Sequence, residues 1–410
     1  MKILFFASDP NLSIGYSRIG NILTNYLSKV GHKIYYFAIS NFKTNLIDRY
    51  IDPNITIIDA LEEEIKLGNN ELYGVNSICD QIKKIQPDIL FLYNDIIVIS
   101  RIFNNLIEKK IEKNFKIYTY LDLVYPYEKI KLVKHVDSYS DLIFVFGEYW
   151  KKNLISIGIN EDKIKILPHG FDDKIFFPID NIDAKKYFNF NPDDFIILNT
   201  NRNNYRKAID KTIDVFIKFL KIKNMDHRIK LFLNMNTNSD SFENGYDINN
   251  QILINCIEQN ISYDLVLSNH VFIRNSLTNY TDAQLNILYN ACDIGINTCV
   301  GEGFGLCNLE HAGIGKPQII SNVGGLTDIF NSEYSFPINP IERLYVGNQL
   351  DWHGGFIEIC PTDKFVSALV TYFDNNELIK AHSKKSLEII TKNYNWNNIL
   401  DNLQNIILNN

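Results

Sequence analysis

The stretch KILFFASDPNLSIGYSRIGNILTNYLSKVGHKIYYFAI, residues 2–39, decides the fold class. Residues 2–8 form a nearly continuous apolar run, as in a strand buried on both faces of a parallel sheet. Residues 15–31 place Ile19, Leu23 and Leu27 on one helical face, and Gly31 is a natural C-cap. Residues 32–39 form a second apolar run. The order strand, helix, strand predicts a parallel βαβ unit.

The same alternation continues along the chain. Further strands are expected at 88–94, 116–124, 141–147 and 163–170, and a second series at 195–201, 230–236, 265–273, 293–299 and 317–322. Residues 169–194 are richer in Asp and Pro and are expected to be a linker, Thr281 and Gln284 form a capping-box pattern, and the tail from about 363 is expected to be helical. We therefore predict two doubly wound α/β domains, 1–175 and 176–385, facing a cleft, and a helix at 386–410 that crosses back to the first domain.

Composition excludes several classes. The 410 residues are 46% apolar and 22% charged, as in an ordinary globular protein, and the net charge of −7 without a basic tail argues against nucleic acid as a partner. The six cysteines form no C-x-x-C pair, which favours free thiols in a reducing compartment. The N-terminal apolar run is too short for a signal peptide, and no run reaches the roughly 18 apolar residues of a membrane span. A cytoplasmic location is expected.

Two stretches that follow predicted strands are candidates for phosphate binding. In SIGYSR, residues 13–18, Gly15 precedes a helix, but the dinucleotide fingerprint G-x-G-x-x-G is missing, so the glycine is either structural or a phosphate contact. In NTNRNNYRKAID, residues 199–210, three cations cluster: Arg202, Arg206 and Lys207. They either bind phosphate or form a solvated start to a helix. Cations oppose the dipole at a helix start, which favours the phosphate interpretation.

A third stretch, GEGFGLCNLEHA at 301–312, carries two carboxylates around a glycine-rich helix start. Gly303 and Gly305 allow a sharp turn, and the helix is expected to begin between Phe304 and Leu306. With a nucleotide diphosphate bound at that helix start, one of the two carboxylates, Glu302 and Glu310, would accept hydrogen bonds from the ribose hydroxyls. The other would face a sugar attached to the diphosphate. Alternatively, Glu302 is a turn residue and Glu310 an exposed helix residue. No H-E-x-x-H or D-x-D motif occurs, so no metal site is expected.

These stretches together resemble the retaining glycosyltransferases of the GT-B fold, family four. Residues 301–325 resemble the E-x7-E region of that family, ILPHGFDDKIFFP at 166–178 its interdomain signature, and Arg202 and Lys207 its Arg-x4-Lys phosphate motif. Residues 271–299 resemble its base-binding loop, helix and strand. With SIGYSR and YNDIIVI at 93–99, the resemblance extends to the compact enzymes of large DNA viruses, which would place the protein in the host cytoplasm.

The resemblance implies transfer of a hexose from a nucleotide diphosphate sugar, GDP-mannose or a UDP-sugar, with retention at the anomeric carbon. Arg202 and Lys207 would neutralise the leaving diphosphate, Glu302 would hold the donor sugar and Glu310 the ribose. The remaining donor contacts would come from Gly15, Tyr16, Ile273, Arg274, Leu277, Gly303, Phe304, Gly305 and Leu306. The acceptor hydroxyl would attack the face that the phosphate leaves, and neither a metal nor another cofactor is implied.

One position departs from the family pattern. Many members carry His-Asp after the strand that is YTYLDLV here, and this chain has Leu121 followed by Asp122. The identity of the donor sugar therefore stays open, and we expect Asp122 to be a catalytic residue. A glycan, a lipid-linked molecule or a protein would be the acceptor. Basic residues in YPYEKIKLVKH, at 125–135, either touch a membrane surface or form a solvated helix face.

Two other functions remain open at this stage. A GT-B-fold sugar-nucleotide epimerase would need acid–base residues near the anomeric carbon, and none is identified. A catalytically silent nucleotide-sugar-binding protein is the alternative from another class, and the presence of Arg202, Lys207, Glu302 and Glu310 argues against it. The missing fingerprint at 13–20 disfavours a dinucleotide-dependent oxidoreductase. Oligomeric state cannot be predicted from these patterns.

Overall fold

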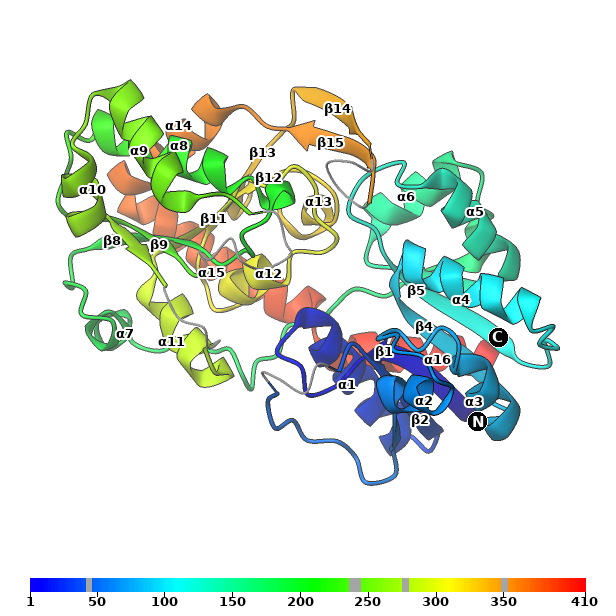
Figure 1. Cartoon of the computed structure of the whole chain (residues 1–410). Helices are drawn as coiled ribbons and strands as arrows, with labels where there is room; N and C mark the ends of the chain where they lie inside the picture. Colours follow the sequence, from blue (N-terminus) through cyan, green and yellow to red (C-terminus); the bar gives the residue numbers. More distant parts are fainter. Residues whose placement is uncertain (42–45, 236–244, 275–279, 348–352) are drawn as a thin grey trace. The chain divides into compact units, whose positions relative to one another are not determined.

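The computed structural model describes residues 1–41, 46–235, 245–274, 280–347 and 353–410. The chain divides into two compact units (Figure 1). Unit 1 comprises Met1–His169 and Asn397–Asn410, and unit 2 comprises Gly170–Trp396. The C-terminal helix therefore belongs to the same unit as the N-terminal strand.

Unit 1 is built on a seven-stranded sheet in the order β3-β2-β1-β4-β5-β6-β7, with every pair of neighbours parallel. The strands are β1 (Lys2–Ser8), β2 (Lys33–Ile39), β3 (Thr56–Asp59), β4 (Ile89–Asp95), β5 (Lys116–Asp122), β6 (Leu142–Val145) and β7 (Ile164–Ile166). The order reverses between β1 and β4, as in doubly wound folds. Residues 3–7 of β1 are fully buried, so the prediction of a central strand is confirmed.

The helices of unit 1 follow the predicted alternation. They are α1 (Gly15–Lys29), α2 (Ala60–Lys66), α3 (Ile78–Ile85), α4 (Ile96–Glu108), α5 (Ile130–Tyr139), α6 (Glu148–Ser156) and the C-terminal α16 (Trp396–Asn409), with a short 3-10 turn at Glu161–Lys163. Side-chain hydrogen bonds join α16 to the first βαβ unit. The Tyr26 hydroxyl donates to Asp401 at 2.6 Å, and His32 Nε2 lies 2.8 Å from Gln404 Oε1.

Unit 2 is built on a six-stranded parallel sheet in the order β10-β9-β8-β11-β12-β13. Its strands are β8 (Phe195–Asn199), β9 (Ile229–Leu233), β10 (Val271–Ile273), β11 (Ile294–Asn297), β12 (Gln318–Ser321) and β13 (Ser335–Ile338). A separate antiparallel hairpin pairs β14 (Glu342–Val346) with β15 (Gly355–Ile359), and the Glu358 amide donates to the Val300 carbonyl at 2.9 Å. Two parallel α/β sheets of this topology confirm the predicted fold class.

The helices of unit 2 lie between these strands and form most of the tail. They are α7 (Asn181–Tyr187), α8 (Ile209–Ile222), α9 (Ile248–Gln259), α10 (Tyr263–Asn269), α11 (Asp282–Ala291), α12 (Leu306–Gly313), α13 (Leu326–Ile329), α14 (Thr362–Asp374) and α15 (Asn376–Asn393), with a 3-10 turn at Tyr205–Lys207. The capping box at Thr281 and Gln284 is present, and the helical tail is confirmed.

Three predictions about local structure were wrong or incomplete. The strand expected at 265–273 begins only at Val271, because Ser262 caps a helix there by accepting from the Leu265 amide. The linker at 169–194 contains α7, which Asp180 caps in the same way. Strands β3 and β13 and the β14–β15 hairpin were not predicted, since short and partly exposed strands carry little apolar periodicity.

Candidate donor-binding site

A buried ion pair lies at the centre of the candidate site in unit 2. Lys207 ends the 3-10 turn after β8, and the Asn204 side chain accepts from its amide at 3.2 Å. The Lys207 ammonium donates to Glu302 Oε2, and Arg206 Nη1 lies 3.5 Å from Glu302 Oε1. Arg206 also donates to the Gly301 carbonyl at 3.0 Å. Two cations from one loop therefore hold the first carboxylate of the glycine-rich stretch.

Burial and charge act on Glu302 in opposite directions. Burial by itself raises the pKa of the carboxyl, and the side chain is only 6% exposed. The charges of Lys207 and Arg206, with hydrogen bonds from Lys207 and the Asn297 side chain, outweigh this effect and hold the pKa of Glu302 below its ordinary value. The carboxylate is therefore ionised at neutral pH, and it partly neutralises the charge of Lys207 and Arg206.

The glycines around Glu302 are required by the backbone geometry. Gly305 is the N-cap of α12 with a φ of 98°, in the left-handed region that favours glycine. Gly324, which lies just before α13, has a φ of 52°, and a Cβ there would lie 2.1 Å from the Glu302 carbonyl oxygen. That oxygen accepts from the Gly325 amide at 3.0 Å. The loop at 323–325 thus packs against the backbone of Glu302 and fixes its position.

The second carboxylate, Glu310, is on α12 and faces the interior of unit 2. It is 5% exposed, and the Tyr289 hydroxyl of α11 donates to its Oε2 at 2.9 Å. The alternative in which Glu310 is an exposed helix residue is therefore wrong, whereas Glu302 lies in the loop before α12 with a buried, ion-paired side chain. The helix itself begins at Leu306, inside the predicted interval, and the N-cap Gly305 provides no side chain that could accept from the amides of its first turn.

The other predicted donor contacts of unit 2 are spread along one edge of its sheet. Arg274 follows β10, its guanidinium lies 4.3 Å from the Tyr280 ring centroid, and its Nη1 donates to Asn234 at 3.1 Å. Ile273 ends β10, and Leu277 lies outside the described residues. Phe304 is buried with its ring centroid 6.1 Å from that of Tyr394.

The structure places Arg206, rather than Arg202, beside Glu302. The Arg202 side chain is exposed, whereas Arg206 contacts both Glu302 and the Gly301 carbonyl. Arg206 belongs to the basic cluster seen in the sequence, but the Arg-x4-Lys motif of the resemblance indicates only Arg202 and Lys207 as site residues. Arg206 and Lys207 both lie in the 3-10 turn Tyr205–Lys207, and the sequence alone did not indicate that turn.

The predicted residues of unit 1 form a second group of contacts. The Tyr16 hydroxyl, from the first turn of α1, lies 2.7 Å from Asp122 Oδ2 and 2.7 Å from Asp95 Oδ1. Asp95 and Asp122 are register partners at the carboxyl ends of β4 and β5. Burial, with the charges of Asp122 and Asp95, raises the pKa of Tyr16 well above its ordinary value. Gly15 opens α1, and Leu121 is buried.

Asp95 was missed by the sequence analysis, although a signal was available. It ends a strand adjacent to that of Asp122, and the carboxyl ends of parallel strands share one edge of a sheet. A phenol carries one proton, so it donates to one carboxylate at a time. The short contacts to both carboxylates therefore make Tyr16, Asp95 and Asp122 one hydrogen-bonded unit.

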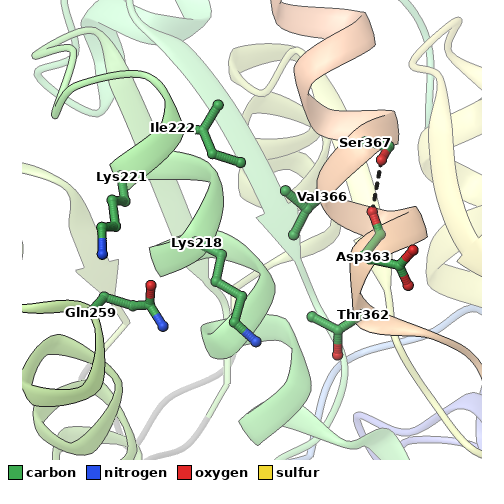
Figure 2. Close-up of a pocket in the computed structure, with 8 residues that line it drawn as sticks. All are labelled: Lys218, Lys221, Ile222, Gln259, Thr362, Asp363, Val366 and Ser367. Carbon is green, nitrogen blue, oxygen red and sulfur yellow. Dashed lines mark hydrogen bonds between the residues drawn. The ribbon is translucent and has the colours of Figure 1, made fainter.

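A surface hollow of about 650 Å³ also occurs in unit 2, apart from these residues (Figure 2). It lies between the end of α8, the end of α9 and the start of α14, whereas Lys207 precedes the start of α8. Lys218, which lines it, is paired with Asp214 at 2.8 Å, and the Ser367 hydroxyl donates to the Asp363 carbonyl at 2.8 Å. None of the predicted site residues lines this hollow.

The described residues provide neither a metal-binding cluster nor a membrane-spanning helix. No group of three or more His, Cys, Asp or Glu side chains in this part of the chain has metal-site geometry. Within the same residues, no helix has the length and apolar character needed to cross a bilayer. The six cysteines are all free.

Comparisons with known proteins agree with this architecture. No protein-family model matches the chain. An uncharacterised glycosyltransferase of Methanocaldococcus jannaschii is 24% identical over 257 residues, which are 60% of this chain. The match covers 54% of that relative, so the chain spans about half the length of the curated protein that it matches.

Solved structures match over the whole chain. Sucrose-phosphate synthase from Thermosynechococcus elongatus has a TM-score of 0.74 at 16% identity, covering 100% of this chain and 98% of that one. Anabaena HepE in complex with UDP-glucose has a TM-score of 0.73 at 15% identity, with full coverage of both chains. WaaG, a glycosyltransferase of lipopolysaccharide biosynthesis, has a TM-score of 0.66 at 12% identity, with 99% coverage of both. At these identities the likeness establishes the fold, which is of the GT-B type.

Proposed function

We propose that the protein is a retaining glycosyltransferase that transfers a hexose from a nucleotide diphosphate sugar to a hydroxyl acceptor. The observation that carries the proposal is the buried cluster of Lys207, Arg206 and Glu302 at the glycine-rich start of α12. Two cations and a helix N-terminus converge there, which is the arrangement that stabilises a leaving diphosphate. Glu302 keeps these cations in place until the diphosphate arrives.

The roles of the individual residues follow from this arrangement. Lys207 and Arg206 bind the diphosphate, together with the backbone of Gly303, Phe304, Gly305 and Leu306. On diphosphate binding, Glu302 is freed to accept hydrogen bonds from the hydroxyls of the transferred sugar. Glu310 accepts from the ribose, with one oxygen already held by Tyr289. Because the chain provides these charges, we propose a reaction that needs no metal.

In the acceptor half of the reaction, the acceptor hydroxyl attacks the face of the sugar that the phosphate leaves. The bond from the anomeric carbon to the acceptor oxygen forms on the face where the bond to phosphate breaks, so the anomeric configuration is kept without a protein nucleophile. A phosphate oxygen takes the acceptor proton, and the nucleoside diphosphate leaves. Asp122, held by Tyr16 in unit 1, is proposed to contact the reacting sugars. The solved HepE complex contains UDP-glucose, which makes UDP-sugars the first donors to test, followed by GDP-mannose.

The proposal is tested by incubating the protein with a panel of UDP- and GDP-sugars and mixed acceptors, with products detected by mass spectrometry. We expect Lys207→Ala to abolish transfer, because the negative charge of the leaving diphosphate then lacks its compensating ammonium. Proton NMR of the product should show the donor's anomeric configuration, and EDTA should leave the rate unchanged. Nucleotide-sugar binding without turnover would instead identify a binding protein, and interconversion of the donor sugar would identify an epimerase.

A further inference from the structure

A series of buried polar contacts runs between the two carboxylates of the candidate site, through side chains and the backbone carbonyl of Tyr289. It starts at Glu302, whose pKa the Asn297 side chain, at the end of β11, helps to hold below its ordinary value. Asn297 Nδ2 also donates to Asn308 Oδ1 at 2.8 Å, and Asn308 Nδ2 donates to Gln318 Oε1 at 2.9 Å. Asn308 is on α12 and Gln318 begins β12, so three elements are linked beneath the glycine-rich loop.

The series continues from Gln318 to the second carboxylate. Gln318 Nε2 lies 3.0 Å from His311 Nδ1, and His311 Nε2 lies 3.0 Å from the Tyr289 carbonyl oxygen. The Tyr289 hydroxyl then donates to Glu310 at 2.9 Å. The Tyr289 and His311 rings stack with centroids 5.2 Å apart. The residues between the two carboxylates are 7% exposed or less: Asn297, Asn308, Gln318, His311 and Tyr289.

The donors and acceptors of this series agree with one assignment of protons. The Asn308 amide donates to Gln318 Oε1, so the Gln318 nitrogen faces His311 and donates to its Nδ1. His311 Nδ1 is therefore the acceptor, and Nε2 carries the proton that the Tyr289 carbonyl accepts. Burial lowers the pKa of His311 to about 3, so the ring is neutral, as this assignment requires.

The backbone leaves space for this arrangement. Gly295 of β11 is the register partner of Gln318, and a Cβ on it would lie 2.1 Å from Gln318 Oε1. The Gln318 side chain thus crosses β11 at a position that any other residue would block. A buried polar network is costly unless all its members are satisfied, and a satisfied one specifies a single arrangement.

We propose that Asn297, Asn308, Gln318, His311 and Tyr289 are positioning residues that hold Glu302 and Glu310 in one fixed relation, so that the ribose and the transferred sugar of a nucleotide diphosphate sugar are bound as a unit. This inference rests on the proposed function. None of the three central residues, Asn308, Gln318 and His311, contacts either carboxylate in the hydrogen bonds described, so their effect on the ligand is transmitted through the network.

The first experiment uses Gln318→Met, which keeps the length of the side chain and removes its hydrogen bonds. Calorimetric titrations with UDP-glucose, GDP-mannose, their nucleoside diphosphates and pyrophosphate compare it with wild type. Affinity for the nucleotide sugar that wild type binds should fall about 3- to 50-fold, as for coupled residues of one network. Affinity for pyrophosphate should stay within about twofold, because Lys207 and Arg206 are untouched. Equal losses for all ligands, or no loss, would overturn the inference.

Two variants serve as controls. Gln81→Met removes another buried glutamine, whose amide donates to Glu63 in unit 1, and should change none of these affinities. Tyr289→Phe removes only the hydroxyl that reaches Glu310 and keeps the stacked ring, so it should weaken binding of the nucleoside diphosphate as well. If Gln318→Met does not fold, Tyr289→Phe decides the binding question alone.

The second experiment needs no ligand. Nitrogen-15 NMR of histidine-labelled wild-type protein at pH 7 should show His311 neutral, with its proton on Nε2. A proton on Nδ1, or a charged ring, would contradict the network whatever the protein binds. If wild type binds no nucleotide sugar in the titrations, the proposed function fails and the inference fails with it. The NMR result does not depend on a ligand, so it shows separately whether the hydrogen-bond network itself is correct.

Discussion

The ammonium of Lys207 and the carboxylate of Glu302, 95 positions apart in the chain, form a buried ion pair that Arg206 joins at 3.5 Å. The pair brings the loop after β8 against the loop that precedes α12. Both charges are removed from water, so each depends on the other for compensation. This dependence makes the pair a direct target for measurements of stability and of ligand binding.

Replacing Lys207 with Met should destabilise unit 2 strongly. Glu302 would keep only Arg206 as a charged partner, and removing one member of a buried pair typically costs about 3–5 kcal/mol. Urea unfolding monitored by circular dichroism measures the loss. Lys218→Met is the matched control, since its partner Asp214 is on the same exposed helix face and such a pair contributes only about 0.3–0.5 kcal/mol. Equal effects of the two substitutions would contradict the ion-pair assignment.

The stability contributed by Glu302 should depend on pH in one direction. Its pKa is lower in the folded protein than in the unfolded chain, so the contribution is complete above the ordinary value of 4.5. It is lost as the pH falls through the lower folded pKa. Urea midpoints measured between pH 7 and pH 3 should therefore decline below about pH 4.5 in wild type. The decline should be shallower in Glu302→Gln, and parallel curves would exclude this role.

Substituting Gly324 with Ala should displace the loop that carries Glu302. The added Cβ would meet the Glu302 carbonyl oxygen at 2.1 Å, and the φ of 52° is strained for a residue with a side chain. We expect a loss of about 1–3 kcal/mol in unfolding free energy and weaker binding of nucleoside diphosphate in a thermal-shift titration. Gly347→Ala is the control, because no atom of the described residues lies within 4 Å of its added Cβ. A Gly324→Ala protein as stable as this control would show that the close approach is absent.

Removing the hydroxyl of Tyr16 should reduce sugar transfer more than it reduces binding of pyrophosphate. In Tyr16→Phe, Asp95 and Asp122 lose the donor that lies 2.7 Å from each and repel one another. A loss of about 1–3 kcal/mol in stability is expected from the lost hydrogen bond and the closer repulsion of the two carboxylates. Transfer to an acceptor should fall more than binding of pyrophosphate, which unit 2 provides. Tyr50→Phe, at a side chain that is 71% exposed, should change neither quantity. Equal loss of transfer and of pyrophosphate binding would contradict the role given to Tyr16.

Much of the fold could be predicted because apolar runs and helical periodicity are local properties. Strand β1 and helix α1 begin where the pattern of residues 2–31 places them. The errors came where local signals were weak: the capped helix at Tyr263–Asn269 within an apolar stretch, and short strands such as β13. An apolar run of this length fits a strand or a buried helix equally well, and the Ser262 cap decided between them.

The sequence by itself determined the two α/β series, the glycine-rich helix start at 301–312 and the residue types around it. Only the tertiary structure decided which groups meet. It placed Arg206 rather than Arg202 on Glu302, brought Gly324 against the Glu302 backbone, joined Asp95 to Tyr16 and linked Glu302 to Glu310 through Gln318 and His311. The reason is physical: helices and strands follow from spacing within about ten residues, whereas a buried polar contact depends on partners that the packing of distant elements supplies.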